Sequence, residues 1–164
     1  MSKVPIQTIH LQDINEEVFS RFGYVFEPVR GAERINHSDI AVNLRESAEL
    51  IFAQVLADDL RKNNYVCIEM LEKHPYSSQS FFPLDVNAYL VVVCESDEHG
   101  TPLLHTLNAF KVPGDTSVTY KENVWHTGMA SIDGGRSFTM LVYEDGTKDD
   151  CIFLNIDPFK IKLR

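Results

Sequence analysis

The sequence has few cysteines and no long apolar run, and both shortages exclude classes of protein. Cys67, Cys94 and Cys151 lie far apart, in no CxxC spacing, so we expect reduced, partly buried thiols in a reducing compartment. The longest apolar run, Tyr89–Cys94, is far too short to span a bilayer. Residues Met1–Asp13 lack the apolar core of a signal peptide. We therefore expect a cytoplasmic protein.

Positive charge is also scarce, with 15 Lys and Arg against 24 Asp and Glu and a net charge of −9. Such a chain is repelled by a phosphate backbone and by an anionic membrane surface, so we expect neither nucleic acid nor membrane as a partner. The GxSxG and GxxxxGK[ST] motifs are missing, which argues against a nucleophile elbow and a phosphate loop. A small-molecule substrate remains the best expectation.

The length of 164 residues and the apolar content of 44% suit one domain with its own core. We therefore predict a single domain over residues 1–164. Asp13 or Asn15 can cap one short helix, for which Gly23 would supply a left-handed stop. The apolar face of this helix would carry Ile14, Val18, Phe19 and Phe22.

After this helix the chain is a succession of brief apolar runs separated by turn residues, which is typical of an all-β sandwich or barrel. The polar stretch Arg30–Ser47 is either a long excursion over the barrel or an edge strand. The predicted strands are Tyr24–Glu27, Leu50–Leu56, Tyr65–His74, Ser80–Pro83, Tyr89–Glu95, Leu103–Val112, Ser117–Tyr120, Phe138–Tyr143 and Ile152–Ile156.

The strand that ends at His74 carries the most informative pattern. Alternation places Val66, Ile68, Met70, Glu72 and His74 on one face. If the three apolar residues point into the barrel, Glu72 and His74 also point inward, near its mouth. Burying a charge there is costly unless it is paired or bound to a cation. The inward acid and imidazole therefore need a partner.

Two more side chains can supply that partner. Gln79 shares a face with Phe81 and Pro83 of the next strand, which gives the spacing Glu72-x-His74-x4-Gln79. Much later, Val112-Pro113-Gly114 opens a turn, and His126 follows it. This arrangement is similar to the two cupin motifs, H-x-H-x(3,4)-E and a PxG turn followed by His, which converge on a divalent metal. Here Glu72 stands for the first His and Gln79 for the Glu.

The motifs therefore predict an all-β, cupin-type (RmlC-like) β-barrel with one or two short helices. Glu72, His74, Gln79 and His126 are the predicted metal ligands. Two imidazoles and two oxygen donors suit nickel, manganese, iron or zinc. The residues alone leave open which ion is bound, and whether any is.

Two longer segments carry a sharper resemblance. Met70–Leu84 resembles the ureidoglycolate lyase signature, an LERHPLGSQAFIPL-like string, and Thr119–His126 resembles that family's NYH-(R)-(N/G)-VWH string. The resemblance runs in the same order over most of the chain. Supporting matches are Phe22–Val25, Arg34–Asn36, Tyr89–Cys94, Ala109-Phe110, Val118 and Cys151.

The resemblance implies a homodimeric cupin with nickel as the cofactor. It implies a carbon–nitrogen lyase that splits ureidoglycolate into glyoxylate and urea late in allantoin and purine breakdown. We expect Glu72, His74 and His126 to be the catalytic residues, with Glu72 moving the proton if it is not itself a metal ligand.

Candidates for binding the substrate are less defined. Lys111, Tyr120 and Lys121 could bind its carboxylate, whereas Lys73 is disfavoured by its outward face. Trp125 could stack on the substrate or pack in the barrel. The sequence differs from the family pattern at several positions, namely Asn108, Asp115-Thr116-Ser117, Thr127, Gly128-Met129 and Glu144-Asp145.

These departures keep two other functions open. One is a metal-dependent cupin enzyme that acts on another small hydroxy or oxo acid, and the other is a non-catalytic cupin that binds a ureide or an organic acid. The remaining histidines and the acidic segment Asp145–Asp150 are expected to have no such role: we predict a solvated turn for the segment and surface or core positions for His10, His37, His99 and His105.

Overall fold

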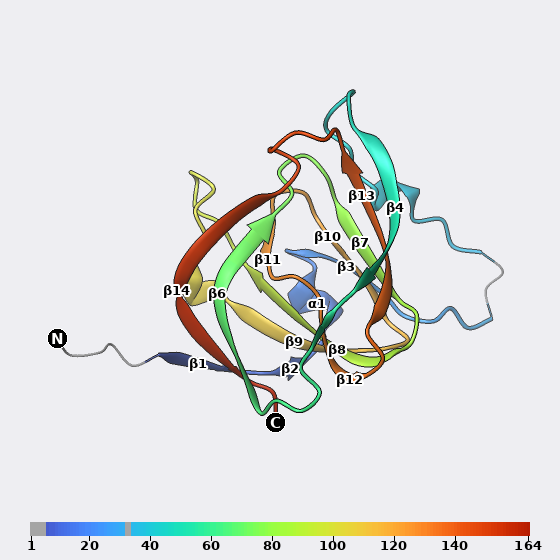
Figure 1. Ribbon diagram of the computed structural model, residues 1–164. Helices are drawn as coiled ribbons and strands as arrows, with labels where there is room; N and C mark the ends of the chain where they lie inside the picture. Colours follow the sequence, from blue (N-terminus) through green and yellow to red (C-terminus); the bar gives the residue numbers. More distant parts are fainter. Residues whose placement is uncertain (1–5, 32–33) are drawn as a thin grey trace.

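A computed structural model of the protein describes residues 6–31 and 34–164, and this part of the chain consists mainly of β-strands in two sheets (Figure 1). The sheets face each other and form a nearly closed barrel, so the predicted all-β, cupin-type barrel is confirmed. Within the described residues, no helix is both long and apolar enough to cross a membrane.

The larger sheet has nine strands. They are β1 (Gln7–His10), β2 (Gln12–Asp13), β5 (Asp58–Asp59), β6 (Tyr65–Lys73), β8 (Val86–Cys94), β9 (Asn108–Pro113), β11 (Trp125–His126), β12 (Ala130–Gly134) and β14 (Ile152–Lys162). Their order is β1-β14-β6-β11-β8-β12-β5, with β9 paired to β8 and β2 paired to β9. The short strand β11 thus joins β6 to β8, two strands that are otherwise separate.

The smaller sheet has five strands in the order β3-β10-β7-β13-β4, and all its pairs are antiparallel. They are β3 (Gly23–Phe26), β4 (Glu49–Leu56), β7 (Gln79–Pro83), β10 (Ser117–Tyr120) and β13 (Ser137–Glu144). Every predicted strand overlaps an observed one. The five that were not predicted, β1, β2, β5, β11 and β12, are short or polar and therefore show no clear period-two pattern.

The short helix is α1 (Glu16–Phe19), and Asn15 rather than Asp13 caps it by accepting a hydrogen bond from the Val18 amide. The prediction of a left-handed stop at Gly23 is wrong, because this residue begins β3 and has no positive φ. Its lack of a side chain has another reason: a Cβ there would lie 1.9 Å from the carbonyl oxygen of Thr119 on β10. Gly23 therefore allows β3 to pair closely with β10.

Two 3-10 turns, η1 (Ser38–Ile40) and η2 (Leu104–Thr106), complete the helical content of the described residues. The second turn shortens the predicted strand Leu103–Val112, which begins at Asn108 instead. In the described part of Arg30–Ser47 no residue belongs to a strand, and Asn43 forms only an isolated bridge with Ser77. Of the two alternatives for this stretch, the long excursion is the observed one.

The core is divided into two clusters because the alternate residues of β8 face opposite ways. Tyr89, Val91 and Val93 belong to a cluster between the two sheets, which also holds Phe19 of α1. Ala88, Leu90, Val92 and Cys94 belong to a second cluster with residues of β6 and β14. Burial on both faces explains why the strand is continuously apolar after Asn87.

The predicted faces of β6 are wrong in its first half. Ile68 and Leu71 both pack in the second cluster, so the alternation breaks between them, and Met70 is largely exposed. The pairing of β14 with β6 shifts register at the same level. This irregularity lets the start of β6 pack in one cluster while its end, with Glu72, faces the other.

We expect Gly23→Ala to lower the free energy of unfolding by about 1–3 kcal/mol, because the added methyl group meets backbone that cannot move away freely. Gly128→Ala is the matched control, since nothing lies within 4 Å of a Cβ there. That substitution should leave stability unchanged or raise it by about 0.4–1 kcal/mol. Urea denaturation of the three proteins measures the difference, and equal effects of both substitutions would contradict the close approach of β3 and β10.

Candidate active site

The strand β6 ends and β7 begins at the same end of the barrel (Figure 1). Polar side chains gather at this end. Glu72 is the last but one residue of β6, and His74 follows this strand directly. Gln79 begins β7, and His126 lies on β11, where it pairs with Glu72 across the ladder. The larger sheet thus supplies three of the groups and the smaller sheet the fourth. All four predicted metal ligands lie together.

The distances between these groups are short. His126 Nε2 lies 3.0 Å from Gln79 Oε1 and 3.5 Å from Glu72 Oε1. The rings of His74 and His126 are stacked, with centroids 5.8 Å apart and an angle of 19° between their planes. One potential ligand atom from each of Glu72, His74 and His126 lies within 4.8 Å of the other two.

Backbone carbonyls fix the direction of both imidazoles. His74 Nδ1 lies 2.8 Å from the carbonyl oxygen of Asp150, and His126 Nδ1 lies 2.8 Å from that of Val124. A carbonyl oxygen only accepts hydrogen bonds, so each Nδ1 carries the proton and donates it. In the neutral rings, both Nε2 atoms therefore present a lone pair. This is how a histidine ligand is normally oriented.

Burial and charge favour the forms of these groups that bind a cation. Burial lowers the pKa of His74 to about 4, helped by the neighbouring His126 and opposed by Glu72. Burial also raises the pKa of Glu72, but the protonated forms of His126, whose Nε2 then donates to the carboxylate, and of His74 lower it by more, so the net shift is downward. At neutral pH, His74 is a neutral base and Glu72 an ionised carboxylate.

These observations fit a bound divalent cation. Gln79 Oε1 and His126 Nε2 are both acceptors when the ring is neutral, and Glu72 Oε1 is a third, so they converge without a proton between them. Two ligands that bind one ion at about 2.1 Å and at right angles lie about 3 Å apart. The observed separations of 3.0 and 3.5 Å are of this size.

Tyr120 lies directly beside these groups. Its ring stacks on that of His126, with centroids 4.2 Å apart. Its hydroxyl is buried and has no hydrogen-bond partner among the described residues. Burial and the charge of Glu72 raise its pKa, so the hydroxyl keeps its proton. An unpaired buried hydroxyl costs about 1–3 kcal/mol, which a bound ligand with an acceptor atom would remove.

The other predicted substrate-binding residues lie elsewhere. Lys111 lines cavities with Lys162 near the start of β6, and seven strand residues, or roughly 23 Å, separate that level from Glu72. Lys121 donates to the carbonyl of Ser20 on the outside of the barrel. Their positions give no support to a substrate-binding role.

Trp125 also faces away from the candidate site. It follows the alternation of β11, so its ring packs in the second cluster and its Nε1 donates to the carbonyl of Gly100. Lys73 lies over this ring, with Nζ 4.6 Å from the centroid. Lys73 thus points away from the candidate site as expected, but it is buried against Trp125 instead of facing outward. Trp125 has a packing role.

The sequence did not predict the ion pairs that fix the segment beside His74. Arg45 forms ion pairs with Asp145 and Asp150. The side chain of Arg45 is only 14% exposed, and those of Asp145 and Asp150 are each 12% exposed. Arg45 also stacks on the ring of Tyr76, in the turn after His74. The predicted turn at Asp145–Asp150 is present, and Gly146–Asp149 are exposed in it. Its two ends, however, are held by Arg45, and the carbonyl of Asp150 orients His74.

A second missed neighbour is Cys151, which follows that segment directly. Its Sγ lies 4.0 Å from Glu72 Oε2, the carboxylate oxygen not paired with His126. Burial raises the pKa of this thiol to about 12, and the charge of Glu72 adds to the effect. Cys151 is therefore a neutral neighbour of the carboxylate. The only indication of this neighbour in the sequence was that Cys151 is among the positions that match the family.

We expect Arg45→Met to loosen the orientation of His74, because Asp150 then loses the cation that holds its segment. Long-range proton–nitrogen NMR correlations of the imidazole rings should show one Nδ1–H tautomer for His74 in the parent protein and a mixture in the variant. His126 is the internal control, since its partner Val124 lies on a different segment. An unchanged His74 signal would refute this role of Arg45.

Comparison with known proteins places most of the chain in one family. Residues 6–162 match the family described as ureidoglycolate lyase. The chain is similar to a ureidoglycolate lyase of Brucella anthropi, with 31% identity over 162 residues that cover 94% of this chain and 90% of the relative. It is 30% identical to one of Brucella abortus over 153 residues, 88% of each chain, and 36% identical to one of Schizosaccharomyces pombe over 89 residues, 51% of this chain and 47% of the relative. The chain belongs to the ureidoglycolate lyase family.

Proposed function

We infer that the protein is a ureidoglycolate lyase, which cleaves ureidoglycolate into glyoxylate and urea and is thus a carbon–nitrogen lyase. The observation that carries this conclusion is the convergence of Glu72, His74, Gln79 and His126 at one end of the barrel of a family member. The curated relatives named above bear this name, and their similarity extends over most of the chain. Neither another hydroxy-acid enzyme nor a non-catalytic binding protein is favoured.

The reaction requires one proton to move between two atoms of the substrate. Ureidoglycolate carries a hydroxyl and a ureido nitrogen on the same carbon. When the hydroxyl loses its proton, the carbon–oxygen bond becomes a double bond and the carbon–nitrogen bond breaks. The departing urea nitrogen takes up a proton. The site must therefore accept a proton from oxygen and return one to nitrogen.

Glu72 is suited to move this proton. Its carboxylate is ionised, and one oxygen faces the imidazoles while the other faces the neutral thiol of Cys151. The second oxygen can accept the hydroxyl proton and pass it to the leaving nitrogen. A positioned acid or base of this kind contributes about 10²–10⁴ in rate. Tyr120, with its unpaired hydroxyl, can donate a hydrogen bond to an oxygen of the substrate.

His74, Gln79 and His126 would hold a divalent cation, for which nickel is our proposal from the family resemblance. Glu72 could contribute Oε1, the oxygen that faces His126, and its other oxygen would then remain the proton acceptor. A cation bound there would act as a Lewis acid, lowering the free energy of the negative charge that develops as the hydroxyl loses its proton. The His74 and His126 rings are already oriented for this by Asp150 and Val124. The positive charge that the substrate's carboxylate requires would come from the same ion.

We further propose that the protein acts in the cytoplasm in allantoin breakdown and works as a homodimer. Cys67, Cys94 and Cys151 are all free thiols, which agrees with a reducing compartment. The homodimer is supported by the resemblance to the family.

Glu72→Gln, His74→Ala and His126→Ala should each lower the rate of urea release from racemic ureidoglycolate by about 100-fold or more, since each removes a proton acceptor or a ligand. His99→Ala is the matched control, because this histidine is exposed at a loop. It should keep the rate of the parent protein. Circular dichroism would establish that all four variants are folded. Full activity in the first three would eliminate the proposed site.

Removal of metal should abolish urea release above the spontaneous rate, because no other cation can then take up the developing negative charge. Elemental analysis of the purified protein should give one divalent ion per chain, and nickel added after chelation should restore activity. His74→Ala should contain little metal after the same purification. A chelated, metal-free protein with undiminished activity would show that the site works without an ion.

A further inference from the structure

The outer face of the five-stranded sheet is free of charged side chains. Alternate residues of its strands, among them Phe81, Phe138 and Val142, pack in the cluster between the sheets, so the residues between them point outward. The outward residues are Leu50, Phe52, Gln54 and Leu56 on β4, Ser137, Thr139, Leu141 and Tyr143 on β13, and Ser80 and Phe82 on β7. None of these carries a charge, although the whole chain has a net charge of −9.

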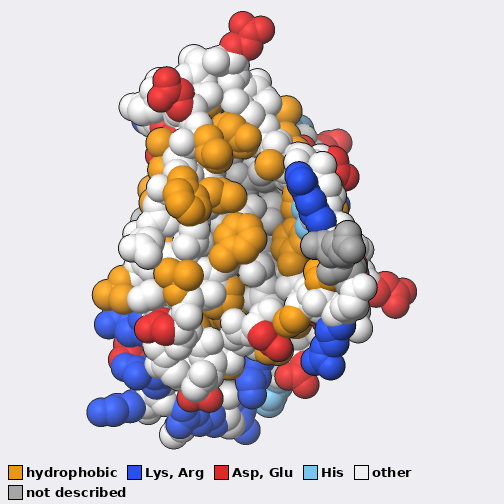
Figure 2. Space-filling model, turned by 90° about the vertical axis from the view of Figure 1, so that its right-hand side faces the viewer, with side chains coloured by type: hydrophobic (Ala, Val, Ile, Leu, Met, Phe, Trp, Pro, Cys, Tyr) orange, Lys and Arg blue, Asp and Glu red, His pale blue; other side chains and the backbone are white. Residues whose placement is uncertain are grey.

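This face is also apolar and open to solvent. Phe52 is 74% exposed and Leu56 67%, and both lie on the edge strand β4. Leu84, just after β7, is also exposed. Figure 2 shows hydrophobic side chains gathered over the middle of this face, with charged side chains mainly at its borders. Contiguous exposed apolar surface of this kind usually marks an interaction site.

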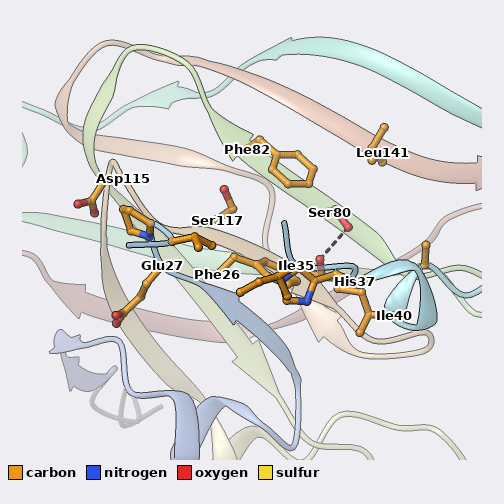
Figure 3. A pocket seen from close by; sticks show the side chains of 14 residues that line it. Phe26, Glu27, Ile35, His37, Ile40, Ser80, Phe82, Asp115, Ser117 and Leu141 are labelled. Atoms are coloured by element: carbon orange, nitrogen blue, oxygen red, sulfur yellow. Dashed lines mark hydrogen bonds between the residues drawn. The ribbon is translucent and has the colours of Figure 1, made fainter. Parts of the chain in front are cut away.

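The same face contains a hollow. A cavity of about 420 Å³ lies between the sheet and the excursion after β3. Ser80, Thr119 and Leu141 line it from the sheet, and Phe82 lies beside them, while Phe26 and Ile35 close the opposite side (Figure 3). Ser80 and Thr119 bond to each other at 2.7 Å, so the floor presents no unpaired hydroxyl. Glu27 and Asp115 also line the hollow, so its uncharged part lies over Ser80, Phe82 and Leu141. That part suits an apolar side chain.

We propose that a second copy of this chain packs against this face and that Phe52 of each copy enters the hollow of the other. The register of the sheet places Phe52 beside Leu141, Leu141 beside Ser80, and Ser80 beside Thr119. Phe52 thus lies in the same row across the sheet as the residues that line the hollow, but on the edge strand at the other side. A two-fold axis parallel to the strands and centred on β7 brings each Phe52 over the partner's hollow.

A second copy is the occupant that the face itself favours. A two-fold interface uses the same patch on both partners, so the patch must contain both the projecting group and its receptor, as this one does. Two chains of equal net charge repel each other except where charge is lacking, and the outward residues of this sheet lack it. Sheets pack face to face at about 10 Å through such side chains.

The size of the face supplies a large part of such an interface. Its strands have four to eight residues each, and at about 3.4 Å per residue and 4.8 Å between strands they cover roughly 470 Å². This is more than half of the surface of about 800 Å² that each partner buries in a standard interface, and the residues of the excursion that line the hollow add to it. The inference rests on the homodimer in the proposed function and specifies the surface that forms it.

The test is sedimentation velocity of the full chain from about 1 to 100 μM, with Phe52→Asp as the main variant. A buried carboxylate at the centre of the contact should raise the dimer dissociation constant by about 100-fold or more. Leu141→Asp changes the hollow instead of the projecting ring and should act in the same direction. Tyr65→Asp is the matched control: it replaces an exposed aromatic residue of the other sheet and should leave the dimer intact.

The possible outcomes separate the two proposals. A parent protein that is monomeric at all concentrations overturns the homodimer itself and with it the occupant of this face. A parent dimer that persists in Phe52→Asp and Leu141→Asp keeps the homodimer but overturns this surface. Dissociation of Phe52→Asp and Leu141→Asp, with thermal unfolding close to that of the parent and with Tyr65→Asp still dimeric, supports it. Urea release, measured separately, tests the catalytic function independently of all three results.

Discussion

Two hydrogen bonds from imidazole rings to backbone carbonyls hold the candidate site together. The carbonyls of Asp150 and Val124 each take the Nδ1 proton of a histidine, so the opposite nitrogens of His74 and His126 point to one place. Glu72 and Gln79 add oxygen atoms at the same place. Without these bonds each ring could rotate, and the acceptors would not converge. The chemistry therefore depends on two backbone segments that are themselves held by the rest of the barrel.

The two sheets contribute differently to this arrangement. The larger sheet supplies Glu72 and His126 as a cross-strand pair, because β11 bridges β6 and β8 only at this level. The smaller sheet supplies Gln79 on its inner face, whereas its outer face is apolar and uncharged. The five-stranded sheet thus has the polar site on its inner side and, on its outer side, the surface proposed to contact a second copy of the chain. A partner on the outer face would support β7, the strand that carries Gln79, without touching the site.

Period-two alternation predicted an all-β fold and most of its strands, and the similarity to the cupin motifs predicted the barrel type and the four converging groups. The direction of Glu72 was predicted correctly but for an incorrect reason, since the irregularity after Ile68 breaks the assumed alternation. The contact of Arg45 with Asp150 joins residues 105 positions apart. No local pattern encodes such a contact, nor the distance of Lys111 from the site. Local periodicity predicts which way a side chain points, whereas tertiary packing decides what it meets.

The central claim is that these four side chains surround one cation. Anomalous diffraction from crystals grown with a nickel salt tests it most directly, because it locates the ion independently of catalysis. We expect an anomalous peak within bonding distance of the Nε2 atoms of His74 and His126, with oxygen atoms of Glu72 and Gln79 close by. A peak elsewhere, or rings of His74 and His126 turned away from each other, would contradict it.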